Sequence, residues 1–238
     1  MGLPLFPIGL WARSTLWDGL SLYLKNDEAG GTRADSSGSV TAFTDNNTTL
    51  GVAGKIGNAA AFVAASTQGL NHADAPSLRI ATSSTLSAWV KLTSKPGQMR
   101  LVSKDFAPAD REYLLYYEPS NDRYGFAVFV GGVGAGLKTV LASSFGSPAL
   151  GTWHYLTAGY NAASQQLFIS VNGGAVNTTS SVASAFGGTS ALWIGRYQTG
   201  IECLNGALDE IKLWNTRVLL PAEVALDYAN GLAGIPLL

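Results

Sequence analysis

The sequence predicts an all-β fold, a two-sheet antiparallel sandwich with one short C-terminal helix. Three observations support this prediction. Many short segments alternate apolar and polar residues, clusters of Gly, Ser, Asn and Asp separate them at fairly regular intervals, and a single stretch has helical periodicity. The chain has 238 residues, which suits one large domain, because β-sandwiches often run to about 250 residues.

The clearest strand is the segment 85–92, which has an apolar residue at every even position and Trp89 on the opposite face. Because both faces carry bulky residues, we expect a central strand. The segments 153–160 and 166–171 follow the same pattern, and 172–174 (Asn-Gly-Gly) predicts a hairpin turn. Further strands are predicted at 21–24, 60–63, 101–104, 113–117, 124–130, 139–142, 192–196 and 208–214.

The only predicted helix covers residues 220–229. Pro221 suits a first helical turn, Val224 and Tyr228 fall on one face, and Gly231 offers a C-terminal stop. We expect this helix to cover an edge of a sheet.

Composition excludes several classes of function. Charged residues make up 13% of the chain and the net charge is -1, so no basic surface for a nucleic-acid backbone is expected. Cys203 is the only cysteine, which excludes internal disulfides and Cys/His zinc sites. No apolar run reaches the roughly 18 residues of a membrane-spanning helix. Residues 1–17 are apolar but lack a basic n-region, so we expect no secretion signal and synthesis in a cytoplasm.

The order of short motifs along the chain carries a resemblance to a known family. The motifs are 21–28, 35–38, 54–60 with Phe62, 87–91, 151–154, 171–173, 194–196, 206–211, and 221–223 before Tyr228 and Gly231. In this order they resemble the laminin G-like, concanavalin A-like jelly-roll domains of bacterial and phage surface proteins. The opening strand departs from the family, with Leu24 in place of a usual Trp and Asn26-Asp27-Glu28 in place of Leu-Asp-Glu.

Catalysis is not expected. Related sandwiches hydrolyse glycosidic bonds with two carboxylates about 5 to 9 Å apart. Glu112 and Glu118 lie six residues apart along a strand, which separates them by about 20 Å. The histidines, His72 and His154, accompany no nucleophile motif. We therefore predict that the protein is not an enzyme.

The resemblance implies a structural calcium ion, with Asp35 and Asp209 as ligands. Carboxylate oxygens are the ligands that Ca²⁺ prefers. The alternative is that Asp35 caps its own turn and Asp209 binds loop amides.

A sugar site would need aromatic rings and polar groups on exposed loops. The candidates fall in two loop clusters, with hairpin turns that bind no ligand as the alternative. They are Asn121, Asp122 and Tyr124 in the first and Tyr197, Gln198 and Glu202 in the second. Trp89 and Trp153 lie in mid-strand and are interpreted as core residues.

We divide the chain into an apolar N-terminal arm, residues 1–17, and a jelly-roll domain, residues 18–238. An exposed arm of this composition would approach the apolar area that soluble monomers tolerate. The arm could pack along its own sandwich, against a second copy of the chain or, if the protein belongs to a virus particle, against another virion protein. We expect it to bind a second copy or another protein. The predicted state is a homo-oligomer, a trimer by analogy with phage surface proteins, or a subunit on a larger particle. The arm residues expected to bind are Leu5, Phe6, Ile8, Leu10 and Trp11.

The sequence analysis thus favours a non-catalytic structural protein on the surface of a bacteriophage virion, made in the host cytoplasm and able to bind a cell-surface glycan. The absence of a predicted secretion signal and the initial Met1 favour this setting. The alternative is a carbohydrate-binding or adhesion module of a bacterial extracellular protein.

Overall fold

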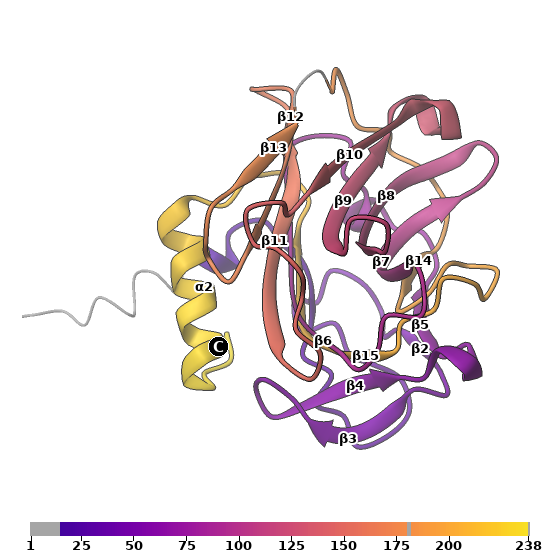
Figure 1. The fold of residues 1–238 in the computed structure, drawn as a ribbon, viewed down its shortest axis with the longest axis vertical. Coiled ribbons are helices and arrows are strands. Elements are labelled where there is room, and N and C mark those ends of the chain that lie inside the picture. The colour runs from indigo at the N-terminus through magenta and orange to yellow at the C-terminus, as the bar shows by residue number, and fades with distance from the viewer. Residues whose placement is uncertain (1–14, 180–181, 238) are drawn as a thin grey trace, which may run out of the picture.

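Two antiparallel sheets face each other in a sandwich (Figure 1). The structure is a computed structural model, and it describes residues 15–179 and 182–237. In the eight-stranded sheet the order is β13-β12-β11-β6-β15-β4-β3, and β1 also pairs with β15. In the seven-stranded sheet the order is β10-β9-β8-β7-β14-β5-β2. The fold class predicted from the sequence is confirmed.

The eight-stranded sheet contains the strands on which the predicted helix packs. Its strands are β1 (Leu20–Leu24), β3 (Thr49–Ala53), β4 (Asn58–Phe62), β6 (Ser84–Leu92), β11 (Trp153–Asn161), β12 (Gln166–Val171), β13 (Asn177–Thr179) and β15 (Gly206–Trp214). As predicted for a central strand, β6 pairs on one side with β11 and on the other with β15.

The seven-stranded sheet contains the consecutive strands β7 to β10, each paired with the next. Its strands are β2 (Thr44–Asn46), β5 (Gly69–His72), β7 (Met99–Phe106), β8 (Asp110–Glu118), β9 (Arg123–Phe129), β10 (Leu137–Leu141) and β14 (Leu192–Ile194). Short 3₁₀ turns occur at Ala64–Ser66, Pro76–Leu78, Val130–Gly132 and Gly134–Gly136. No helix among the described residues is long and apolar enough to cross a membrane.

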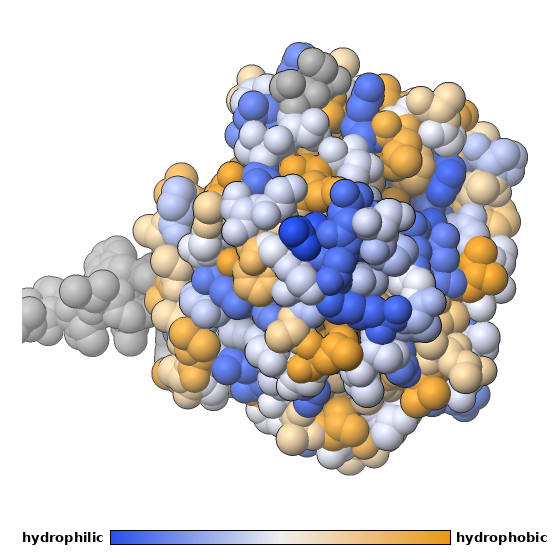
Figure 2. Space-filling view, viewed as in Figure 1, coloured by the Kyte–Doolittle hydropathy of each residue, from blue (hydrophilic) through white to orange (hydrophobic). Residues whose placement is uncertain are grey.

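The main core fills the space between the sheets. The apolar even-numbered residues of β6, from Leu86 to Leu92, point into it together with Leu156 and Ile169 from neighbouring strands. Burial of these faces supplies the main driving force for folding. On the outside, the view in Figure 2 shows apolar residues in small separate patches between polar ones.

Helix α2 (Pro221–Ala233) begins as its sequence predicts but ends later. Pro221 occupies the first turn, and Glu223 accepts a hydrogen bond from the Leu220 amide at 2.8 Å. Gly234 ends the helix in the left-handed conformation, with φ +69°. The observed helix extends the predicted one by four residues, because Asn230 and Gly231 continue it instead of ending it.

The predicted position of this helix is wrong. It contacts β6, β11 and β15 in the middle of the eight-stranded sheet. The Tyr228 ring stacks on Trp89 of β6, with centroids 5.6 Å apart. Asp227 accepts hydrogen bonds from Tyr155 of β11 at 2.7 Å and Lys212 of β15 at 3.0 Å. The interpretation of Trp89 as a core residue is confirmed, since the residue is 2% exposed. The same interpretation of Trp153 is wrong, because Trp153 is only half-buried and lies under Lys91.

The sequence analysis did not predict four of the observed strands: β2, β3, β5 and β13. All have three to five residues, and β2, β3 and β13 lie at sheet edges. Segments of three to five residues are too short to show the sustained alternation by which strands are recognised.

The boundary between arm and domain falls inside a packed segment. Leu16 is fully buried in a small cluster with Trp214 and Leu237. The Trp214 indole N–H donates to the Leu16 carbonyl at 2.8 Å. Residues 15–17 are therefore part of the sandwich domain. The arm residues predicted to bind a partner, Leu5, Phe6, Ile8, Leu10 and Trp11, lie outside the described residues.

Candidate functional site

The outer face of the seven-stranded sheet carries three guanidinium groups, each over an aromatic ring. We call this surface the arginine–aromatic face. Such cation–π contacts are favourable and hold both partners in a fixed orientation. The pairs, with guanidinium-to-centroid distances, are Arg111–Phe129 (4.0 Å), Arg196–Trp193 (4.1 Å) and Arg100–Tyr197 (4.5 Å).

Two irregularities in the pairing of β7 with β8 accompany the outward orientation of Arg100 and Arg111. The register shifts between Arg100 and Val102 and again between Lys104 and Asp105. A β-bulge re-aims the side chains that follow it. Between the bulges Ser103 lies directly opposite Trp193 of β14. The strand thus presents polar groups outward while its apolar residues stay in the core.

Asp105 and Glu202 fix two of the three arginines. Arg111 donates to Asp105 through Nε at 2.6 Å and Nη2 at 3.0 Å. Arg100 also pairs with Asp105, and it donates to Ser103 at 3.1 Å and to Glu202 at 2.5 Å. The hydrogen bond to Asp105 raises the pKa of Arg111 above its ordinary value. Because bidentate pairs of this kind are rigid, the donors of the face are held in place before any ligand arrives.

Arg196 differs from the other two arginines, because no ion pair with a described carboxylate holds it. Its Nη1 donates to the Thr67 carbonyl at 2.9 Å, and burial lowers the pKa of Arg196. Three buried polar atoms here have no hydrogen-bond partner within the described chain: Arg196 Nε, Trp193 Nε1 and Gln198 Oε1. Buried polar groups are normally paired. This end of the face therefore has surplus positive charge and unused hydrogen-bonding capacity.

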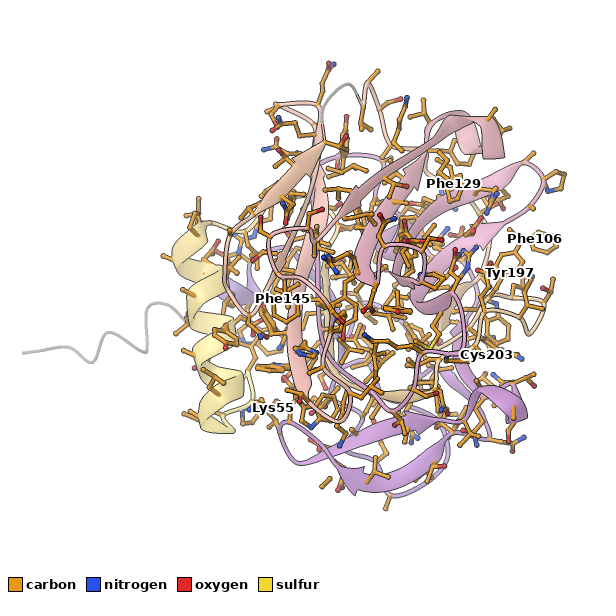
Figure 3. The ribbon with its side chains drawn as sticks, viewed as in Figure 1. Lys55, Phe106, Phe129, Phe145, Tyr197 and Cys203 are labelled. Atoms are coloured by element: carbon orange, nitrogen blue, oxygen red, sulfur yellow. The ribbon has the colours of Figure 1, made fainter. Side chains whose placement is uncertain are left out.

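A small hollow of about 110 Å³ lies beside these pairs, with Leu114, Tyr116 and Phe129 in its lining. Gly125 makes room for the Tyr116 ring, since a Cβ there would come within 2.7 Å of a ring carbon. Phe106 is 40% exposed, and the neighbouring Ala107 amide donates to the Tyr197 hydroxyl at 2.9 Å. Figure 3 shows Phe106, Phe129 and Tyr197 on the same side of the molecule.

Half of the predicted sugar residues lie on this face. Tyr197 and Glu202 contribute a ring and a carboxylate to the network, and Gln198 contributes one of the unpartnered atoms. The sequence analysis missed Trp193 and the three arginines. A usable signal was the sequence Trp-Ile-Gly-Arg-Tyr at 193–197, which places two aromatic residues and a guanidinium around a strand end.

The first predicted cluster lies in and beside the turn between β8 and β9. Asp122 accepts hydrogen bonds from Lys95 at 2.6 Å and Tyr117 at 2.7 Å, and from Ser147. The hydrogen bond from Lys95, followed by those from Ser147 and Tyr117, lowers the pKa of Asp122 to about 2. Asn121 is bound within the turn, where its side-chain amide donates to Glu118 at 2.8 Å.

Tyr124 has no exposed surface and belongs to the main core. Its hydroxyl lies 3.1 Å from His154 Nδ1. The prediction that Tyr124 offers an exposed platform is therefore wrong, because inward alternation along β9 directs the ring between the sheets.

Asp35 and Asp209, the predicted calcium ligands, bind different parts of the backbone. Asp35 accepts hydrogen bonds from the amides of Tyr23, Ser37, Ser39 and Val40 at 2.8 to 3.0 Å. Both of its oxygens are thus used by N–H donors, and a cation would have to displace them. This residue does not fit a calcium site.

Asp209 fits a calcium site better. Its Oδ2 accepts from the Lys55 and Ile56 amides at 2.7 and 2.9 Å, whereas Oδ1 is buried without a partner. Asn26 Oδ1 is also buried and unpartnered, and the same side chain donates to the carbonyl of Leu208 at 3.4 Å. Burial raises the pKa of Asp209 to about 8. The described residues contain no group of three or more His, Cys, Asp or Glu able to hold a metal, so further ligands would be amide and carbonyl oxygens.

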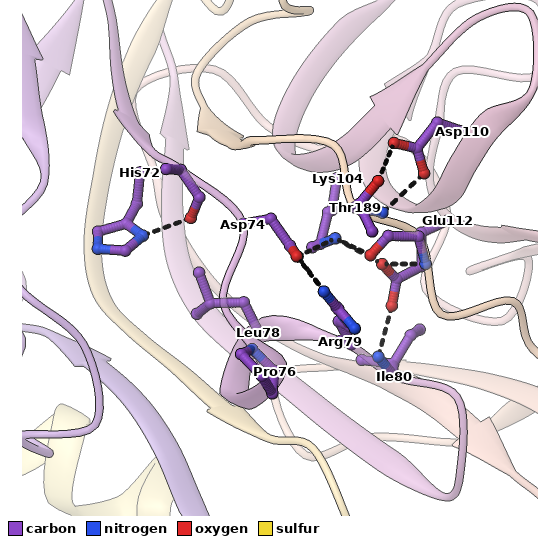
Figure 4. Close-up of polar contacts among 12 residues, drawn as sticks. His72, Asp74, Pro76, Leu78, Arg79, Ile80, Lys104, Asp110, Glu112 and Thr189 are labelled. Carbon is purple, nitrogen blue, oxygen red and sulfur yellow. Dashed lines mark hydrogen bonds and ion pairs between the residues drawn. The ribbon is translucent and has the colours of Figure 1, made fainter.

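A second ion-pair cluster lies on the inner side of the same two strands (Figure 4). Lys104 Nζ contacts Glu112 at 2.8 Å and Asp74 at 2.9 Å, and Asp74 also pairs with Arg79. Lys104 and Glu112 are fully buried. Burial raises the pKa of Glu112 to about 7 against the opposing effect of Lys104. Glu112 is thus held within the fold, apart from Glu118, whose carboxylate binds turn amides.

Comparison with known proteins agrees with the lectin-like sandwich that the sheets define. The sequence profile of the laminin G-like branch, described as the concanavalin A-like lectin/glucanases superfamily, matches residues 64–225. The match covers more than half of the chain, and the chain therefore belongs to this superfamily. A search of curated protein sequences finds no match.

Solved structures share the fold at low sequence identity. Domain 4 of an extracellular GH43 arabinanase from Geobacillus stearothermophilus, in complex with arabinotriose, matches with a TM-score of 0.65 and 17% identity, over 88% of this chain and 98% of that domain. The binding domain of Paraclostridial Mosquitocidal Protein 1 matches with a TM-score of 0.68 and 14% identity, over 90% of this chain. The botulinum neurotoxin serotype D ligand-binding domain, in complex with N-acetylneuraminic acid, matches with a TM-score of 0.65 and 14% identity, over 92%. The chain spans about half, 52%, of both toxin domains.

Proposed function

We propose that this protein is a non-catalytic glycan-binding module whose ligand binds to the arginine–aromatic face. The observation that carries the proposal is the set of three guanidinium–ring pairs on one sheet face, of which Asp105 and Glu202 brace two. A sugar has apolar C–H faces that pack on aromatic rings and adjacent hydroxyls that bind fixed polar groups. Both kinds of partner are present on this face.

The similar structures support a carbohydrate as the ligand. The arabinanase domain that aligns over nearly its whole length was solved with arabinotriose, and the neurotoxin domain with N-acetylneuraminic acid. Catalysis is not proposed. Arginine N–H groups occupy the carboxylates of Asp105 and Glu202, which leaves neither positioned to protonate a glycosidic oxygen.

Glycan-array screening followed by titration calorimetry of the best ligand tests the proposal. We expect Trp193→Ala to weaken binding at least tenfold while the melting temperature changes little, because the ring is only half-buried. The matched control is Trp153→Ala, since Trp153 forms a similar pair with Lys91, 4.8 Å away, on the other sheet. Equal affinity of both variants, or no glycan bound by the parent protein, would refute the proposal.

We further propose that Asp209 and Asn26 contribute oxygen ligands to a structural Ca²⁺ ion. The two buried, unpartnered oxygens support this, and Ca²⁺ takes six to eight such hard ligands. When bound, the ion would neutralise a carboxylate that now lacks a cation partner.

For the biological setting we propose the surface of a bacteriophage virion, with a bacterial extracellular protein as the alternative. The motif resemblance, which is to phage and bacterial surface proteins alike, supports this setting, whereas the similar structures are toxin and arabinanase domains. The neighbourhood of the coding sequence tests the proposal. Capsid or tail genes beside it would support the virion, and genes for secretion or glycan degradation would support the alternative.

A further inference from the structure

A groove of about 360 Å³ lies between helix α2 and the outer face of β11, β12 and β13. We call it the helix groove. Figure 1 shows the helix lying alongside these strands, on the opposite side of the molecule from β7 and β8. The helix groove is therefore separate from the arginine–aromatic face.

The lining of the helix groove is uncharged and largely apolar. Leu219, Pro221 and Val224 form the helix side, and Phe168 and Val176 lie on the strand side. No charged side chain of the described chain lines it. Val176 is 60% exposed, so apolar surface is open to water along the rim. Contiguous apolar surface on a soluble protein usually marks a place where another segment binds.

We propose that residues 3–11 of the same chain bind in the helix groove. The described chain begins next to it. The Thr15 carbonyl accepts a hydrogen bond from Arg217 Nη2 at 2.6 Å, and the residues that follow Arg217, Val218 and Leu219, line the groove. From Thr15 back to Trp11 is four residues, which span about 13 Å when extended.

The composition of residues 1–14 matches the groove. Arg13 is the only charged residue among them, and Leu5, Phe6 and Ile8 are large and apolar. Pro4 and Pro7 each fix φ and lack an N–H donor, so this segment brings fewer backbone donors that would need partners in a largely apolar groove. An uncharged groove would also accept such a segment without leaving a buried charge unpaired.

Covalent attachment favours the segment of the same chain over that of a second copy. A short tether holds its end at an effective concentration in the millimolar range, above that of free protein in most experiments. The proposal thus replaces the partner-bound arm expected from the sequence with an arm bound to its own domain.

Cysteine cross-linking in the full chain tests the proposal. In a Cys203→Ser background, the pair Ile8→Cys and Val176→Cys reports on the groove. The control pair is Ile8→Cys and Val133→Cys, because Val133 is 40% exposed and lies outside the groove lining. We expect the groove pair to form an intramolecular disulfide at least tenfold faster, at a rate independent of protein concentration. Equal rates for both pairs, or disulfide-linked dimers as the main product, would overturn the proposal.

Limited proteolysis gives a second measurement that introduces no cysteine. Val176→Asp places a charge on the groove rim, and Val133→Asp is the matched control on another loop. We expect chymotrypsin to cleave after Leu10 or Trp11 about tenfold faster in Val176→Asp than in the parent or the control. Cleavage at the same rate in all three proteins would contradict the proposal. Circular dichroism of each variant verifies that the sandwich is folded.

Discussion

Two groups of charged residues lie on opposite sides of β7 and β8, and they differ in what the charges do. On the arginine–aromatic face, arginines lie over rings beside a hollow, and Arg196 has no described carboxylate partner. In the inner cluster, Lys104 and Glu112 are fully buried and bind only groups of the same domain. A fully paired charge without solvent access supports the fold, whereas Arg196, which has no described carboxylate partner, keeps hydrogen-bonding capacity that the proposed ligand would use.

The bulge between Lys104 and Asp105 produces both environments. It allows Asp105 and Arg111 to pair on the outside. One residue away on each strand, Lys104 and Glu112 pair on the inside. A regular register would place these four residues differently, so the irregular pairing is needed for the face and for the cluster alike.

The largest effect is expected from Lys104→Met. This change leaves Glu112 buried without its cation, and breaking a buried ion pair in this way costs about 3 to 5 kcal/mol. We expect a loss of that size in the free energy of unfolding, measured by urea denaturation. The control is Lys138→Met, because Lys138 is exposed on β10. If both variants lose the same small amount of unfolding free energy, the inner cluster does not stabilise the fold.

Asp209 can be compared with Glu112, because both are buried carboxylates but only Glu112 has a cation partner. The pKa of Asp209 is about 8 in the folded protein and 3.8 ordinarily, so the folded state binds the proton more tightly. Stability should therefore fall as pH rises from about 4 to about 8, by on the order of 2 to 4 kcal/mol. We expect Asp209→Asn to flatten this fall, as followed by melting temperature.

Calcium provides the matching test at the same residue. A bound ion stabilises the ionised carboxylate, so Ca²⁺ should raise the melting temperature most at pH 8 and have little effect near pH 4. Chelator should reverse the rise, and Asp209→Asn should abolish it. A melting temperature that is the same with Ca²⁺ and with chelator at pH 8 would retire the calcium proposal.

Arg196→Lys tests the arginine–aromatic face. Lysine keeps the charge but loses the planar group that stacks on Trp193. We expect glycan affinity to fall about tenfold, which corresponds to about 1.4 kcal/mol, with stability nearly unchanged. Titration calorimetry measures the affinity and thermal melting the stability. Loss of stability without loss of affinity would assign Arg196 to the fold and not to the ligand.

Sequence reasoning predicted the fold better than the site, for a physical reason. The core strands have an apolar residue at every second position, and this local pattern is visible without a structure, as in β6 and β11. The arginine–aromatic face is assembled from β7, β8, β9, β14 and the loop after it. Its geometry depends on two bulges that no local pattern indicates. Tyr197 and Glu202 are predicted because they lie in one loop. Arg100 and Arg111 join the face only through contacts with residues distant in sequence, such as Glu202 and Phe129, and the sequence does not show these contacts.

The smallest effect is expected at Asp122, whose charge network is exposed and can be compared with the buried ones. Its side chain is 40% exposed, and that of Lys95 is 19% exposed. Because its pKa is lowered to about 2 from an ordinary 3.8, the network contributes stability above about pH 4 and loses it as pH falls toward 2. Solvent screens such pairs, so we expect Asp122→Asn to cost less than about 1 kcal/mol at pH 7 and nothing near pH 2. Urea denaturation at both pH values measures this. The prediction fails if Asp122→Asn lowers the free energy of unfolding at pH 7 as much as Lys104→Met does. Exposed and buried charge pairs would then stabilise the fold equally.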